Sequence, residues 1–262
     1  MTPPMRSPTI SARATPAASG LRWWTDSVWW LFGDVARIGV WIGMLLCLVL
    51  ILFPLHWFPF VGSLVSNLLW FVFCGGLMVA ARHTERGQVP RFSELFAGFG
   101  PQGGALAGAG LIVLLATLAV VGLMLTIGLG VIISALGSVT SLEDFAESPP
   151  PALLSIGGGS LLLLFLCLLL FVPISMAAWL APALIMLRGA SAVDALRLSL
   201  AACRRNLGAL TVYGLVGAGL AVVATLTFLI GWILLLPLVF LSTYAAYRDL
   251  FEQDVEIVDA GR

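Results

Sequence analysis

Long stretches without a charged residue constrain this chain more than any other feature. No aspartate, glutamate, lysine or arginine occurs between Ile38 and Ala81, and similar uncharged runs cover 104–137, 152–187 and 207–247. A helix needs about 20 apolar residues to cross the hydrocarbon core of a bilayer. Only 10% of the 262 residues are charged and the mean hydropathy is +1.07, whereas about 25% of a soluble domain is charged. The sequence therefore predicts an integral membrane protein.

The lengths of the uncharged runs predict six membrane spans. These spans are 38–56, 60–81, 104–137, 152–187, 207–228 and 232–247. Each of the two middle runs is too long for one upright helix and is read as a single long or tilted span. The span at 152–187 is expected to bend or break near Pro173, because proline removes a helical hydrogen bond. Gly104 and Gly108 have the GxxxG spacing that lets membrane helices approach closely.

The arginines predict the orientation of the spans. All thirteen basic residues are arginines, and six spans place every one of them on the side that holds residues 1–37 and 248–262. The opposite side receives the acidic loop 138–151, with Glu143, Asp144 and Glu147. Loops rich in arginine remain in the cytoplasm of bacteria. We therefore expect a bacterial inner-membrane protein with both of these terminal regions in the cytoplasm.

Three polar segments precede the hairpins of spans, at 21–36, 82–103 and 188–206. Each is expected to hold an amphipathic helix at the membrane surface, including a short one over 92–99. The segment 21–36 is rich in tryptophan, a residue that favours the headgroup interface; an aromatic ligand box is the alternative. The predicted fold class is thus all-α, a polytopic membrane helical bundle with six transmembrane helices plus cytoplasmic interfacial amphipathic helices.

The third polar segment gives the clearest amphipathic helix, over 191–205. Ser191 and Asp194 match a capping box, and Gly189 suits the end of the preceding helix. The apolar stripe consists of Val193, Leu196, Leu200, Cys203 and Leu207. The other side carries Arg197, Arg204 and Arg205, which we predict to be a surface for lipids or a partner protein.

Three regions follow from this organisation. Residues 1–20 are rich in proline, serine, threonine and alanine and are predicted to be a disordered cytoplasmic tail. Residues 21–251 form a single six-span membrane domain. Residues 252–262 form a short acidic cytoplasmic tail.

Several stretches resemble a known group of membrane proteins. They are Trp30-Leu-Phe32, Pro59-Phe-Val-Gly62, Gly75-Gly-Leu-Met-Val-Ala-Ala81, Phe92-Ser-Glu-Leu-Phe-Ala-Gly-Phe99, Ala195-Leu-Arg-Leu-Ser199 and Tyr244-Ala-Ala-Tyr-Arg-Asp-Leu-Phe251. Together they resemble an uncharacterised proteobacterial multi-pass inner-membrane family, similar to YciC-like proteins and to the membrane domain of some glycerophosphodiester phosphodiesterases. The resemblance implies an architecture and brings no catalytic residues.

Candidate sites for chemistry are few. The four cysteines lack CxxC spacing, so neither a metal centre nor a redox pair is predicted, and no cofactor is expected. His83, Glu85 and Glu94 lie close together in sequence, but their spacing matches no catalytic motif and favours a solvated loop. Asn67 is the best polar candidate within a span, and we interpret it as the donor or acceptor of an interhelical hydrogen bond rather than part of a pathway.

The function predicted from these features is non-catalytic binding of membrane lipids or a partner. The partner could be another membrane protein or a second copy of the chain. A transporter or permease-like component is the alternative, although no ionisable residue lies inside a predicted span. A membrane enzyme acting on lipid headgroups is a further alternative. Nucleic-acid binding is not expected, because no basic face alternates with aromatic residues outside the spans.

Overall fold

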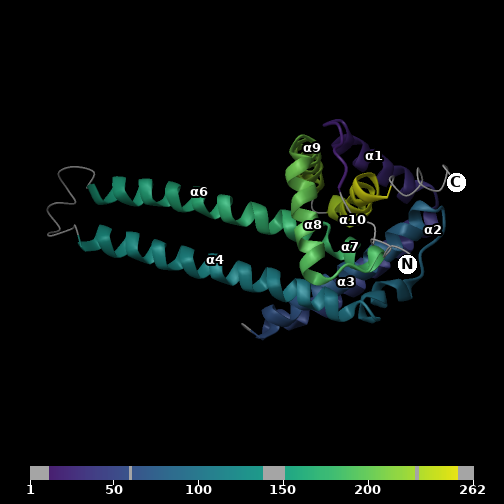
Figure 1. The fold of residues 1–262 in the computed structure, drawn as a ribbon, viewed down its shortest axis with the longest axis horizontal. Coiled ribbons are helices and arrows are strands. Elements are labelled where there is room, and N and C mark those ends of the chain that lie inside the picture. The colour runs from purple at the N-terminus through teal and green to yellow at the C-terminus, as the bar shows by residue number, and fades with distance from the viewer. Residues whose placement is uncertain (1–11, 59–60, 138–150, 228–229, 253–262) are drawn as a thin grey trace, which may run out of the picture. The chain divides into compact units, whose positions relative to one another are not determined.

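The computed structural model describes residues 12–58, 61–137, 151–227 and 230–252, and this part of the chain is helical without a β-strand (Figure 1). The elements in chain order are α1 (Ser19–Phe32), α2 (Val35–Leu52), η1 (Phe53–Trp57), α3 (Val61–Glu85), η2 (Phe92–Phe99), α4 (Gly103–Gly137), α6 (Pro151–Trp179), α7 (Ala181–Arg188), α8 (Ala192–Arg205), α9 (Leu207–Leu226) and α10 (Ile230–Phe251). The all-α prediction is confirmed. The acidic loop at 138–150, residues 1–11 and residues 253–262 lie outside the described residues.

Six segments are long and apolar enough to cross a membrane, as predicted. They are Val35–Trp57, Val61–Glu85, Gly103–Ile133, Gly158–Arg188, Leu207–Leu226 and Gly231–Phe251. Each observed segment overlaps one predicted span, because length and hydropathy decide both. The long run after residue 103 is one continuous helix, α4.

The chain divides into two compact units, whereas the sequence predicts one membrane domain over 21–251. One unit comprises Met1–Leu111 and Met176–Arg262, and the other comprises Ile112–Ser175. Within the second unit, Gly128 of α4 faces Leu163 of α6, and Gly159 of α6 faces Val131 of α4. Glycine lets these two antiparallel helices lie close together. The second unit carries no charged residue in its described part.

The first unit is organised around α1, which packs against α9 and α10 (Figure 1). Trp23 and Trp24 of α1 are buried, and the Trp24 ring stacks on Tyr213 with centroids 5.0 Å apart. The Trp23 ring centroid lies 6.2 Å from that of Trp179. The prediction that this tryptophan-rich segment faces the membrane interface is therefore wrong for Trp23 and Trp24, which fill the protein core. Trp29, 78% exposed, remains available to the interface.

The segment before α4 folds as the short helix η2, which is a 3-10 helix lying against α3. Leu95 is fully buried, and the rings of Phe96 and Phe99 make edge-on contacts with Phe73 of α3 at centroid distances of 5.9 and 5.3 Å. The predicted amphipathic helix over 92–99 is confirmed: Leu95 and Gly98 are buried against protein, whereas its three phenylalanines remain 41–52% exposed. Its attachment to α3 follows from this aromatic contact.

The break in the fourth span lies at Leu180, between α6 and α7, and not at Pro173 as the sequence predicts. Pro173 lies inside the continuous helix α6, whereas Pro182 begins α7. At the break the Ser199 hydroxyl of α8 accepts from the Leu180 N–H at 3.1 Å and donates to the Met176 carbonyl at 2.6 Å. A side chain inserted into the helical ladder is a known cause of a sharp break.

We expect Ser199→Ala to lower the free energy of unfolding by about 1–3 kcal/mol, because Ser199 is fully buried, the Leu180 N–H loses its acceptor and the Met176 carbonyl keeps only the weak Cys203 thiol donor. Thermal unfolding in mild detergent measures the change. Ser175→Ala is the matched control, since the exposed Ser175 hydroxyl bonds only to the Phe171 carbonyl of its own helix at 2.9 Å. Equal midpoints for both variants would contradict a role for Ser199 at the break.

Candidate functional site

Helix α8 begins and ends as the sequence predicts. The Ser191 hydroxyl accepts from the Asp194 N–H at 3.2 Å and donates to the Asp194 carboxylate at 2.7 Å. Gly189 ends α7 with φ 65°, in the left-handed conformation that glycine adopts without strain. These two features fix where the chain leaves α7 and enters α8.

The buried face of α8 differs from the predicted stripe. It consists of Ala195, Leu196, Ser199, Ala202 and Cys203. Val193 is instead 43% exposed and Leu207 is 51% exposed. The small residues let α8 lie against α7 and α9, so its inner face packs on protein. Burial raises the pKa of the Cys203 thiol to about 11, which keeps it a neutral packing group.

The predicted arginine surface lies on the exposed side of α8. Arg197 and Arg204 are exposed, and neither has a hydrogen-bond or ion-pair partner in the described part of the chain. They are seven residues apart, so two helical turns, about 10 Å, separate them on one face. Arg205 instead donates to the Ala12 carbonyl at 3.1 Å. The structure thus assigns two of the three predicted arginines to the open surface.

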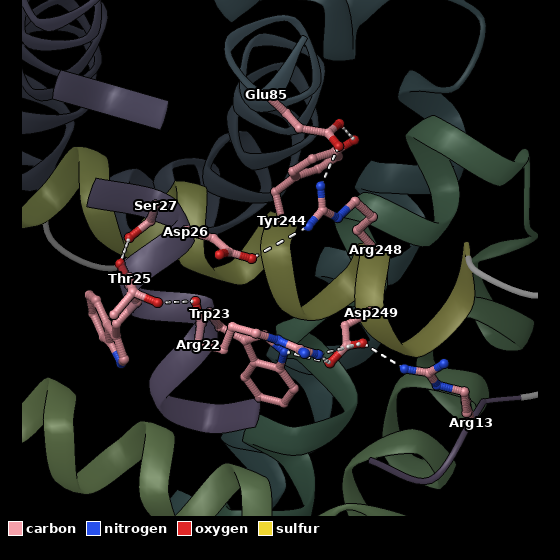
Figure 2. A network of polar contacts seen from close by, with 11 residues as sticks. Arg13, Arg22, Trp23, Thr25, Asp26, Ser27, Glu85, Tyr244, Arg248 and Asp249 are labelled. Carbon is pink, nitrogen blue, oxygen red and sulfur yellow. Dashed lines mark hydrogen bonds and ion pairs between the residues drawn. The ribbon is translucent and has the colours of Figure 1, made fainter. Parts of the chain in front are cut away.

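A buried carboxylate, Asp249, joins α10 to the N-terminal region (Figure 2). It is 4% exposed and accepts from Arg13 at 2.8 Å, from Arg22 at 3.3 Å and from the Trp23 indole at 3.0 Å. Buried carboxylates persist when hydrogen bonds and opposite charges replace water. The sequence analysis did not identify this residue. Its position directly after the uncharged run 207–247 and Arg248 is the signal that could have placed its carboxylate close to the helical bundle.

A second ion cluster lies one residue away, at Arg248 (Figure 2). The Arg248 guanidinium contacts Glu85 of α3 at 2.6 Å and Asp26 of α1 at 3.4 Å, while the Tyr244 hydroxyl donates to Glu85 at 2.7 Å. The guanidinium also lies 4.9 Å from the centroid of the Trp30 ring. Burial raises the pKa of the Asp26 carboxyl, and the nearby Arg248 charge opposes that shift. The cluster connects α1, α3 and α10.

The chain before α1 is held by Asn206, at the junction of α8 and α9. Its Oδ1 accepts from the Thr15 N–H at 2.7 Å and from the Thr15 hydroxyl at 3.1 Å. Its amide nitrogen donates to the carbonyls of Arg13 and Ala202, both at 2.9 Å. The prediction of disorder over 1–20 is therefore wrong for residues 12–20, which contact the bundle or belong to α1.

Other arginines of this region bind backbone carbonyls. Arg37 donates to the Gly87 carbonyl at 2.6 Å, and Arg188 donates to the Phe251 carbonyl at the end of α10. The guanidinium groups of five arginines then have no hydrogen-bond or ion-pair partner among the described residues: Arg82, Arg86, Arg91, Arg197 and Arg204. Over the whole chain thirteen arginines are balanced by thirteen carboxylates, so the unpaired guanidinium groups, and not a net charge, are what could bind an anion.

The structure brings together one pair that the sequence places in a solvated loop. His83 Nδ1 lies 2.6 Å from Glu94 Oε1, and Glu94 Oε2 is buried without a partner. Glu85 binds Arg248 instead and does not join this pair. No group of three histidine, cysteine or acidic side chains suited to a metal ion occurs within residues 12–58, 61–137, 151–227 and 230–252. The pair offers a base and its orienting acid without a nucleophile.

Asn67, the polar candidate within the second span, does not make the hydrogen bond that the sequence predicts. Its Oδ1 is buried and has no partner within the described ranges. An interhelical hydrogen bond through this atom is therefore not part of the fold of these residues. Asn67 lies on α3 and is far in sequence from the arginines of α8.

Comparison with family models, curated proteins and solved structures returns no match for this chain. The resemblance to YciC-like proteins therefore stays a prediction. The site consists of two arginines on one exposed helical face, both without a partner among the described residues, and of a network that connects α8, α10 and the N-terminal region.

Proposed function

We propose that this chain is a non-catalytic protein of the bacterial inner membrane that binds anionic lipid headgroups through Arg197 and Arg204 of α8. Six apolar helices long enough to span a membrane support the membrane assignment. Arginine near a membrane surface attracts anionic lipid by about 1 kcal/mol per residue. Its planar guanidinium also pairs well with phosphate.

The observation that carries the proposal is the difference between paired and unpaired arginines. Arg13, Arg22 and Arg248 bind carboxylates of the same chain, so their charge is used within the fold. Arg197 and Arg204 have no such partner in the described residues and project from a helix whose other face is fixed by packing. An exposed guanidinium on such a helix can bind a phosphate without first breaking an internal ion pair.

The helix break at Leu180 gives little support to the alternative function of a transporter. Substrate sites of transporters often use the free backbone groups of a broken helix. The break at Leu180 offers two such groups, but Ser199 binds both the Leu180 N–H and the Met176 carbonyl.

The enzyme alternative would need a nucleophile or metal beside His83 and Glu94. Lipid binding therefore stays the better supported proposal, with a protein partner as the alternative use of the same arginines.

We expect Arg197→Gln/Arg204→Gln to weaken binding of phosphatidylglycerol about tenfold or more, since each lost charge removes about 1 kcal/mol and 1.4 kcal/mol is tenfold. Native mass spectrometry of the detergent-solubilised protein, titrated with phosphatidylglycerol, measures the apparent Kd. Arg197→Lys/Arg204→Lys is the matched control and should keep most of the affinity. Phosphatidylethanolamine should bind weakly to every variant. An unchanged Kd in the glutamine variant would reject lipid binding at α8.

The proposed orientation has its own test. Alkaline phosphatase is active only outside the cytoplasm, so a fusion after Asp144 should be active and a fusion after Glu256 inactive. The physical reason is the position of every arginine on one side of six spans. The reverse pattern of activity would show that the terminal regions lie outside the cytoplasm, and the proposed contact with the cytoplasmic leaflet would fail with it.

A further inference from the structure

We propose that the acidic segment 252–262 of this chain binds Arg197 and Arg204 and competes there with anionic lipid headgroups. This inference rests on the proposed function, because it assigns a regulator to the same two arginines. The acidic segment carries Glu252, Asp254, Glu256 and Asp259 against a single arginine, Arg262. Its charge is therefore complementary to the exposed face of α8.

The point where α10 ends lies beside α8. The Arg13 N–H donates to the Leu250 carbonyl at 3.0 Å, one residue before the last residue of α10. The preceding residue, Ala12, accepts from Arg205 at 3.1 Å. Two adjacent residues thus connect the end of α10 to the end of α8. The acidic segment begins next to the arginine-bearing end of α8.

The length of the acidic segment is sufficient to reach both arginines. Ten residues in extended conformation span about 33 Å, whereas two helical turns between Arg197 and Arg204 span about 10 Å. Arg204 directly precedes Arg205, whose guanidinium already lies at the Ala12 carbonyl. Three carboxylates, at 254, 256 and 259, can therefore lie along a face that presents two cations.

Two arginines near the end of α10, Arg13 and Arg188, already have partners within the fold. Arg13 is paired with Asp249, and Arg188 donates to the Tyr247 hydroxyl at 3.1 Å and to the Phe251 carbonyl. Arg197 and Arg204, in contrast, have no partner in the ranges that the structure describes. Exposed ion pairs are individually weak, because water and salt screen both charges. A weak intramolecular contact of this kind can be displaced by lipid at the membrane surface.

The test neutralises the acidic segment with Asp254→Asn/Glu256→Gln/Asp259→Asn. Apparent Kd for phosphatidylglycerol is then measured by native mass spectrometry on the full chain. We expect binding to tighten about threefold to tenfold, as the loss of two exposed pairs predicts. The matched control, Glu143→Gln/Asp144→Asn/Glu147→Gln, removes the same charge from a different loop and should leave the Kd unchanged.

The same neutralisation in the Arg197→Gln/Arg204→Gln background identifies the binding surface. If the acidic segment acts by occupying these arginines, its neutralisation should have no effect once they are gone. Equal tightening in both backgrounds would overturn the proposal, because it would indicate general repulsion between the segment and anionic lipid. No tightening in the original background would overturn it too, while the proposed function would stand if the arginine change alone weakens binding. If neither change alters the Kd, both proposals fail.

Discussion

Replacing Asp249 by alanine should lower the free energy of unfolding by about 2–4 kcal/mol, the largest effect that we expect from a single charged residue of this chain. The Asp249 carboxylate is buried and accepts from Arg13, Arg22 and Trp23. Its removal leaves the buried Trp23 indole N–H without an acceptor. The two arginines are partly exposed and can return to water, so their contribution is smaller.

Two further variants separate the parts of this effect. Asp249→Asn keeps an oxygen for the Trp23 indole and loses the charge, so we expect a smaller loss than for alanine. Asp194→Asn changes an exposed carboxylate but keeps an oxygen that can accept from the Ser191 hydroxyl, so it should alter stability by no more than about 0.5 kcal/mol. Thermal unfolding in mild detergent gives the ranking. An Asp249→Ala protein as stable as the Asp194→Asn protein would contradict the proposed role of the network.

Limited proteolysis provides a local measurement of the same variant. Arg13 is held by Asp249 and by its own N–H bond to the Leu250 carbonyl. Trypsin cleaves after arginine, and cleavage requires that the chain leave its contacts. Loss of Asp249 should therefore accelerate cleavage after Arg13, while cleavage after the exposed Arg86 should keep its rate.

The spans could be predicted from the sequence because hydropathy and length are local properties. Residues 38–81 carry no charge whatever the rest of the chain does, and α4 is continuous because nothing in 104–137 interrupts it. The capping residues of α8 are equally local: Ser191 and Asp194 are three positions apart and bind each other directly. The residues that determine such features all lie within the same short segment of the sequence.

The partners of buried polar groups could not be predicted in this way. Pro173 and Pro182 are equivalent by sequence, and the break occurs near Pro182 because Ser199, from another helix, binds the freed backbone groups. Asp249 likewise depends on Arg13, 236 positions away. The arginines of α8 were identified from their helical spacing, but which of them stay free depends on Ala12, which binds Arg205.

Close helix approach shows the same difference between local and non-local information. GxxxG spacing points to Gly104 and Gly108, yet a Cβ on Gly104 would have no neighbour within 4 Å and one on Gly108 would meet Ala192 at an ordinary 3.5 Å. Tight contacts with another backbone segment lie instead at Gly20, at Gly62, and at Gly76 and Gly98, where η2 lies on α3. Spacing within one helix does not reveal which glycine meets another backbone.

We expect Gly98→Ala to destabilise the chain by about 1–3 kcal/mol, because the new methyl group has no space. A Cβ at Gly98 would overlap the Val72 carbonyl oxygen, and a Cβ at Gly76 would overlap the Leu95 carbonyl oxygen. Both obstacles are backbone atoms, which cannot turn away as a side chain can. To admit the methyl group, η2 must move off α3 and expose Leu95, which is fully buried.

Gly104→Ala separates this overlap from the general effect of replacing glycine. Its Cβ meets nothing within 4 Å, and alanine reduces the entropy of the unfolded chain, so this variant should equal the parent or gain about 0.4–1 kcal/mol. The two substitutions add the same methyl group to the same region, and thermal unfolding in one detergent compares them directly. A Gly98→Ala protein as stable as the Gly104→Ala protein would mean that η2 does not lie on α3 at this distance. If the overlap governs stability, Gly76→Ala should repeat the loss, since it places a methyl group against the same helix from the other side of the contact.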